Sequence, residues 1–343
     1  MNFTSPWTEL LDADVTSRWP WADAEPEHRI TAQIRSQGLA AWAFRHAPLD
    51  SNWKREFLPD TRKLAERNLI LIALSRSLEE LWKLAGLRAV RLKGIDLIQR
   101  SEGKDLGATL RDARMWRPLS DLDYLFVDRV DLEEARQALR SRGWQMHLPE
   151  SAGKEVWLLK TAGQEVALEL HTKLIFNEPQ EWRWSEWIEM SRDGRAYQLK
   201  LPALWIHLSG HWVVGHACQK YFWLLDLKML GPMLSKSDWE QVSNLARQLS
   251  LRQACALSLA CVQRLKSELT DQDVSSTGFQ SELRSSKRTQ LWSRLILLRP
   301  LRHRGFRSLG IRVSVRDRSL HAAQYVFYWI RSAMSRPRSR GEL

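Results

Sequence analysis

Residues 117–127 read RPLSDLDYLFV, so two carboxylates stand one residue apart at the start of an apolar run. Side chains alternate between the two faces of a strand, which places Asp121 and Asp123 on one face and Leu122 on the other. The apolar residues 124–127 predict a buried, central strand. Like charges beside apolar surface repel each other and lose solvation, and a divalent cation relieves both costs. Because Mg²⁺ prefers carboxylate oxygens, metal-assisted phosphoryl or nucleotidyl transfer is the first hypothesis for this chain.

The composition is that of an ordinary globular protein, with 343 residues of which 44% are hydrophobic and 27% charged. Three cysteines, an odd number, argue against a secreted disulfide scaffold. The first 28 residues contain several acidic groups and no apolar core, which argues against a signal peptide. The longest apolar runs are too short to cross a bilayer. We therefore expect a cytoplasmic protein.

The net charge of +12 is concentrated at the C-terminal end of the chain. Residues 284–343 contain 15 basic and two acidic groups, whereas the preceding 283 residues contain 37 and 38. We rank three readings of this Arg-rich and aromatic tail. A basic helical cap on the rest of the protein comes first, and a contact with an anionic membrane surface or an acidic partner comes second. Nucleic acid comes third, because no nucleic-acid-binding motif is present.

Hydrophobic periodicity predicts that the N-terminal part of the chain mixes helices and strands and that the C-terminal part is helical, with the polar, Ser-rich residues 270–281 as a linker. Strands are expected at 87–92, 121–127, 144–147, 155–160 and 165–171, with Ala162-Gly163 as a hairpin turn. Helices are expected at 28–44, 60–85, 95–100, 131–142, 203–217, 220–233, 237–249, 251–267, 284–299 and 319–335, with a loop over 101–116. Most tryptophans are expected to pack in the core.

Two further segments complete a constellation around the acidic pair. In the strand over 165–171, Glu169 and His171 share a face, so Glu169 can supply a third carboxylate if this strand pairs near Asp121. Three carboxylates around one or two Mg²⁺ ions suit in-line attack on a nucleotide α-phosphate. Upstream, Lys93-Gly94 stands where a strand turns into a helix. There a glycine lets backbone N–H groups approach a phosphate, and the lysine adds positive charge.

These blocks together resemble those of the uncharacterised bacterial nucleotidyltransferase family, which belongs to the DNA polymerase beta-like superfamily. The similarity covers roughly residues 60–235, and it rests on the following segments: RLKG at 91–94, RPLSDLDYL at 117–125, LELH at 168–171, and the helical stretch 204–230 with its histidines and WLLD. One departure is the spacing. The superfamily places Gly-Ser about a dozen residues before the acidic pair, whereas here Ile95 follows Gly94 and Asp121 comes 27 positions later.

The resemblance implies an α+β fold, with a small mixed sheet as the nucleotidyltransferase core, N-terminal helices and an all-helical C-terminal half. We divide the chain into an N-terminal helical segment (1–59), the core (60–200), a helical bundle (201–270) and the basic tail (271–343). Mg²⁺ or Mn²⁺ would be held by Asp121, Asp123 and Glu169, the predicted catalytic residues. The predicted nucleotide contacts are Lys93, Gly94, Arg117 and Ser120.

Simpler readings of these residues stay open. The acidic pair could be solvated strand-end carboxylates, and Glu169 an ordinary surface residue. Lys93 could pair with Asp96 or another acid, and Arg117 could reach phosphate or pair with the carboxylates.

The helical half has open readings as well. His207 and His211 have metal-ligand spacing, but their apolar neighbours favour a buried, satisfied pair or a wall of the cleft. Buried Asp226 needs a partner, either an interdomain hydrogen bond or the nucleotide.

We therefore predict an Mg²⁺-dependent enzyme that moves an NMP from an NTP, such as ATP, to an unidentified hydroxyl-bearing acceptor. The resemblance places it in surface-polysaccharide or peptide-modification biosynthesis. Two classes of alternative remain. One is a catalytically degenerate scaffold with the same fold, and the other is a basic protein that binds nucleic acid or a membrane surface.

Overall fold

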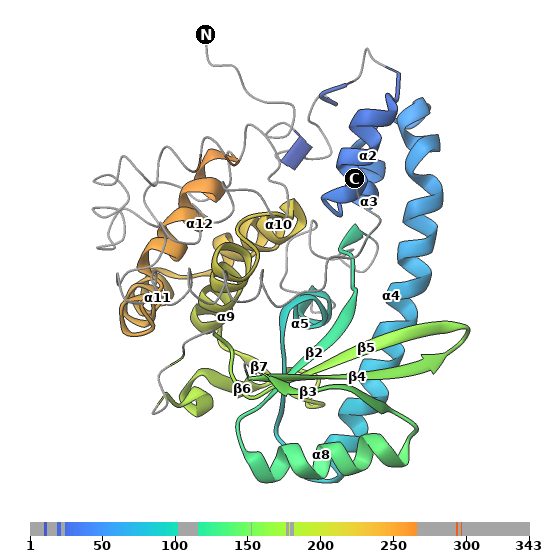
Figure 1. Ribbon diagram of the computed structural model, residues 1–343. Coiled ribbons are helices and arrows are strands. Elements are labelled where there is room, and N and C mark those ends of the chain that lie inside the picture. Colours follow the sequence, from blue (N-terminus) through green and yellow to red (C-terminus); the bar gives the residue numbers. More distant parts are fainter. Residues whose placement is uncertain are drawn as a thin grey trace, which may run out of the picture.

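The computed structural model describes residues 10, 11, 19–21, 25–101, 116–151, 153–175, 178, 182–265, 293 and 296. Within these residues the predicted α+β class is confirmed: N-terminal helices lead into a seven-stranded mixed sheet, which is followed by further helices (Figure 1). The interior of the predicted loop over 101–116, the linker over 270–281 and nearly all of the basic tail lie outside the described residues. None of the described helices is both long and apolar enough to cross a membrane.

The N-terminal helices differ from the prediction in where they begin and end. The single helix expected over 28–44 is wrong, because α2 (His28–Ser36) and α3 (Ala40–His46) are separated at Gly38, whose φ is +71°. This left-handed backbone favours glycine and ends a helix. The long helix α4 (Asn52–Leu84) starts eight residues earlier than expected, because the Ser51 side chain accepts the N–H of Lys54 as an N-cap.

The sheet has the strand order β3-β4-β5-β2-β1-β7-β6. Its strands are β1 (Ala89–Arg91), β2 (Asp121–Phe126), β3 (Gln145–Ser151), β4 (Lys154–Thr161), β5 (Gln164–His171), β6 (Ile188–Met190) and β7 (Tyr197–Leu199). At the centre, β2 is antiparallel to β1 and parallel to β5. The hairpin turn between β4 and β5 is confirmed, with φ values of +47° at Ala162 and +71° at Gly163.

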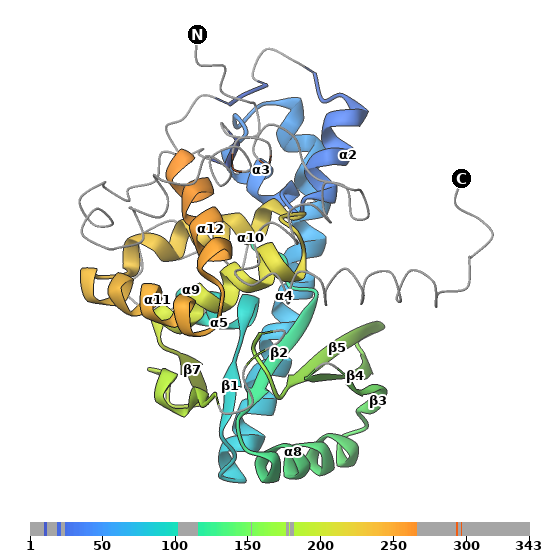
Figure 2. The same ribbon diagram turned by 60° about the vertical axis from the view of Figure 1, so that its left-hand side comes forward.

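Helices cover the sheet through its apolar side chains. Trp82 of α4 packs edge-to-face on Tyr124 and Phe126 of β2, so α4 covers the face to which these rings point. After β1 comes α5 (Lys93–Ser101), and after β2 comes α8 (Arg129–Ser141), seen below the sheet in Figure 2. The predicted start of the latter helix at 131 is wrong by two residues, because Asp128 is its N-cap.

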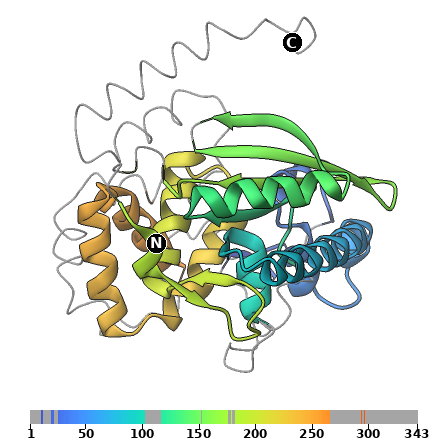
Figure 3. The ribbon, with the colours of Figure 1, turned by 90° about the horizontal axis from the view of Figure 1, so that it is seen from below.

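The C-terminal half of the described chain is helical, as predicted. It contains α9 (Leu201–Ser209), a π-helical turn (Gly210–Gly215), α10 (Tyr221–Leu230), a 3₁₀ turn (Gly231–Met233), α11 (Lys236–Gln248) and α12 (Arg252–Arg264). Seen from below, these helices, coloured yellow to orange, lie on the opposite side of the molecule from α4 (Figure 3). Their core includes an edge-to-face contact between Trp205 and Trp239, and many of the other tryptophans are buried as expected.

Candidate active site

Parallel pairing of β2 with β5 brings the predicted carboxylates together. Asp123 and Glu169 are direct register partners, and His171 lies two residues further on the same face of β5. Ligand atoms of Asp123, Glu169 and His171 all lie within 4.8 Å of one another. His171 Nε2 is 2.9 Å from Asp123 Oδ1 and 3.4 Å from Glu169 Oε2. The predicted pairing of the Glu169 strand beside the Asp121 strand is therefore present.

Asp121 lies on the same strand but outside this converging trio. It is paired in register with Ala167, two positions before Glu169, and its Oδ1 accepts a 2.7 Å hydrogen bond from Ser120 Oγ. Burial and the neighbouring Asp123 charge raise the pKa of Asp121, and Lys93 offsets part of that rise. The predicted ligand Asp121 is thus a neighbour of the cluster, and its place in a metal shell stays a prediction.

Lys93 is the cation that the structure places among the carboxylates. Its Nζ lies 2.6 Å from Asp123 Oδ1 and 3.6 Å from Glu169 Oε2, while Asp96 pairs with Arg100 instead. Burial would lower the pKa of Lys93, but the Asp123 and Glu169 charges outweigh burial and raise it. Its backbone is left-handed, with a φ of +52°, where β1 turns into α5. A non-glycine residue in this region is strained, and such strain is concentrated at functional sites.

The cluster has the charge and donors to hold a divalent cation. Burial alone would raise the pKa of Asp123, but the Lys93 charge and the His171 hydrogen bond hold it well below its usual range. The pKa of Glu169 is also lowered, against burial, by its hydrogen bond with His171. Lys154 Nζ lies 2.6 Å from the other oxygen, Glu169 Oε1. The buried carboxylate of Asp123 and the partly buried carboxylate of Glu169, both ionised, fit such an ion together with an imidazole, provided that Lys93 moves aside.

Arg117, a predicted phosphate contact, makes a different interaction in this structure. Its guanidinium forms a two-pronged ion pair with buried Asp226 of α10, at 3.2 Å (Nε–Oδ1) and 2.8 Å (Nη2–Oδ2). Burial raises the pKa of Asp226, and the charge of Arg117 opposes that rise. Of the two readings of Asp226, the structure therefore shows the hydrogen bond between the segment before β2 and the helical half.

Gly94 is required for the position of Arg117. A Cβ atom at residue 94 would lie 1.9 Å from Arg117 Nη1 and 2.6 Å from Leu119 Cδ2, so no larger residue fits without displacing them. This packing role does not test the predicted approach of the backbone at Gly94 to a phosphate. The sequence signal, a glycine after a lysine, is the same for both roles.

His207 of α9 and His211 of the π-helical turn after it lie close enough to the site for its charges to shift their pKa values. His207 Nδ1 is 3.2 Å from the carbonyl oxygen of Leu174, which can only accept, so Nδ1 donates. Burial, and then the charges of Lys93 and His171, lower the pKa of His207 to about 3. The ring centroid of His211 is 6.2 Å from that of His207, and its pKa is also lowered. The predicted satisfied, buried pair is met only in part: His207 is buried and His211 is partly buried, and His207 Nε2 has no partner among the described residues.

A neutral His207 makes stability depend on pH. An unfolded histidine has a pKa of about 6.5. Between pH 6.5 and 3, His207 is therefore protonated in the unfolded chain but neutral in the folded protein. Stability is full above this window and falls as the pH drops through it. We expect the free energy of unfolding of wild type to fall by about 2 kcal/mol more than that of His207→Gln between pH 7 and pH 5. Urea titrations at both pH values measure the difference, and equal losses would contradict it.

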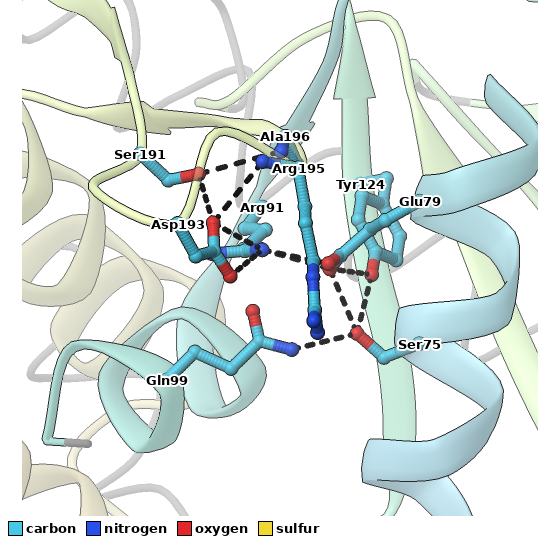
Figure 4. Close-up of polar contacts among 9 residues, drawn as sticks. All are labelled: Ser75, Glu79, Arg91, Gln99, Tyr124, Ser191, Asp193, Arg195 and Ala196. Carbon is cyan, nitrogen blue, oxygen red and sulfur yellow. Dashed lines mark hydrogen bonds and ion pairs between the residues drawn. The ribbon is translucent and has the colours of Figure 1, made fainter. Parts of the chain in front are cut away.

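A buried polar network behind β2 was missed by the sequence analysis. Glu79 of α4 accepts from Arg91 Nε and Nη2 at 2.8 and 2.6 Å and from Tyr124 Oη at 2.6 Å (Figure 4). Ser75 bonds both Glu79 and Tyr124, and Asp193 from the β6–β7 turn pairs with Arg91 at 3.0 Å. The available signal was the helical spacing of Ser75, Glu79 and Trp82, which puts the glutamate on the buried stripe of α4.

The family described as uncharacterised nucleotidyltransferase matches residues 23–266, which include all the described strands and every residue of the site. No curated protein matches the chain.

Proposed function

The chain belongs to the uncharacterised nucleotidyltransferase family, and from that premise we propose that it transfers an NMP from an NTP to a hydroxyl group of an acceptor. The observation that supports this proposal most directly is the convergence of Asp123, Glu169 and His171 on three neighbouring ligand positions. Carboxylates placed in this way, with a lysine among them, suit a triphosphate that arrives with a divalent cation.

Each side chain of the site has a proposed task. Asp123 and Glu169, with Asp121 beside them, would hold Mg²⁺ or Mn²⁺, which when bound neutralises phosphate charge and lowers the pKa of the acceptor hydroxyl. Lys93 is already ionised and lies partly buried at the carboxylates, so it can turn its ammonium toward the triphosphate once another cation neutralises them. The first N–H groups of α5, which begins at Lys93, would orient the phosphates. Arg117 and Asp226 fix the segment that leads into β2.

Nucleotide binding tests the proposal directly. We expect isothermal titration to show binding of Mg²⁺-NTP to wild type and its loss in the variant Asp121→Ala/Asp123→Ala, because that variant has lost two of the three carboxylates. The exposed Glu165, on the same strand as Glu169, supplies the control Glu165→Ala, which should bind like wild type. Equal binding in wild type and the double variant would overturn the proposed site.

The acceptor needs a separate experiment. Incubating the protein with α-labelled NTPs and a cell extract should label a sugar, lipid intermediate, peptide, protein or RNA. Binding of nucleotide without any labelling would favour the scaffold alternative, for which the Lys93–Asp123 ion pair is a specific observation: this lysine already satisfies the carboxylates. We propose surface-polysaccharide or peptide-modification biosynthesis as the setting, and the neighbouring genes would test it.

A further inference from the structure

The donor set of the site contains a nitrogen atom. Two carboxylate oxygens come from adjacent strands, and the third converging atom is Nε2 of His171, a residue that is 7% exposed. The third carboxylate of the predicted set, Asp121, lies outside this trio. The register of β2 and β5 is the reason: Asp123 pairs with Glu169, which shares a face with His171, whereas Asp121 pairs with Ala167, two residues earlier on β5.

We propose that His171 binds the metal ion directly through Nε2 and that the site consequently prefers Mn²⁺ to Mg²⁺. This inference rests on the proposed function and deepens it by naming the ion and a nitrogen ligand. Mg²⁺ favours an octahedral shell of oxygens and gives up water reluctantly, whereas imidazole nitrogen is a good ligand for first-row transition ions. Mn²⁺ accepts both carboxylate oxygen and imidazole nitrogen, so it matches the mixed set of two oxygens and one nitrogen.

Binding requires two rearrangements of charge. In the structure Nε2–H donates a hydrogen bond to the ionised Asp123 Oδ1, which also accepts from Lys93. To bind an ion, Nε2 would have to give up that proton and present a lone pair: a neutral ring would gain a proton on Nδ1 through solvent, and a doubly protonated ring would release the Nε2 proton to solvent and keep the one on Nδ1. Lys93 leaves the shared oxygen because the ion supplies the positive charge in its place.

If His171 only positioned Asp123 and did not touch the ion, a different set of atoms would surround the ion. In that case His171 would remain hydrogen-bonded to Asp123, and the ion would be bound through oxygen alone. Loss of metal affinity cannot separate the two roles, because removing a residue that orients a ligand also weakens binding by about 10–100-fold. Direct detection of nitrogen at the ion can separate them.

The experiment is pulsed EPR of the full chain loaded with MnCl₂ in the absence of nucleotide. We expect ¹⁴N modulation in wild type and its disappearance when the protein is labelled with [¹⁵N]histidine, a test that needs no variant. His171→Gln should lose the ¹⁴N modulation as well, while His147→Gln, at an exposed histidine of β3, should retain it. By competition titration, Mn²⁺ should bind wild type at least about tenfold more tightly than Mg²⁺, and His171→Gln should lose most of that preference.

Each outcome bears on one claim. Mn²⁺ bound without ¹⁴N modulation, modulation that survives in folded His171→Gln, or absence of Mn²⁺ binding would each overturn the inference. Nitrogen-bound Mn²⁺ in a protein that neither binds nor transfers nucleotide would leave the inference standing and overturn the proposed function. Nucleotide transfer by a protein whose Mn²⁺ is bound through oxygen atoms alone would overturn the inference and leave the proposed function standing.

Discussion

Asp123→Asn is expected to lower NMP transfer by at least about a thousandfold, equivalent to about 4 kcal/mol of transition-state stabilisation. Asparagine keeps the shape of the side chain but removes the charge that faces Glu169 and that accepts from Lys93 and His171. Both the metal site and the position of the lysine depend on that charge. The measurement is the rate at which α-labelled NMP is transferred to acceptors in a cell extract.

The control for this prediction is Glu165→Gln, which removes a carboxylate of β5 at an exposed position and should transfer at the wild-type rate. Far-ultraviolet circular dichroism of all three proteins establishes that they are folded. If Asp123→Asn transferred NMP within about tenfold of wild type, Asp123 would not be part of the catalytic machinery.

Glu79→Ala is expected to reduce the free energy of unfolding by about 3–5 kcal/mol, because it leaves the buried Arg91 guanidinium without its main counter-charge. Tyr124 Oη and Ser75 Oγ also lose an acceptor in a site that water does not reach freely. Asp193 compensates only in part, since its side chain is 41% exposed. Urea unfolding followed by tryptophan fluorescence measures the loss.

The neighbouring residue gives a matched control. Glu80 is on the same helix and is exposed, so Glu80→Ala should change the free energy of unfolding by less than about 0.5 kcal/mol. Similar losses in the two variants would show that the network behind β2 does not stabilise the fold.

The sequence predicted the parts of the site that follow from local periodicity. Asp123, Glu169 and His171 lie on strands whose alternation is evident from the residues, and the hairpin at Ala162-Gly163 fixes the register between β4 and β5. Pairing of β2 with β5 could only be assumed, because nothing local specifies which strands become neighbours. The resemblance to a family supplied that information.

Other features were beyond local reasoning for identifiable reasons. Strands β6 and β7 have three residues each, too few to show a period. The break at Gly38 depends on a positive φ, which a helical pattern on both sides conceals. Arg117 has two chemically equivalent choices of partner, phosphate or carboxylate, and only the position of α10 decides that Asp226 is within reach. His171 converges with Asp123 and Glu169 because it shares a face of β5 with Glu169, and that convergence depends on the pairing of β5 with β2.

Asp123 and Tyr124 are consecutive residues that point to opposite faces of the same strand, one into the site and the other into the network around Glu79. The site and the network around Glu79 therefore both depend on the position of this one peptide unit. For protein engineering, this means that the two faces of β2 can be treated separately. Residues on the face of Asp123 can be exchanged to alter the proposed metal site while the network around Glu79 holds β2 in place. A substitution at Glu79 or Tyr124, by contrast, would displace the side chains of the site although it removes none of them.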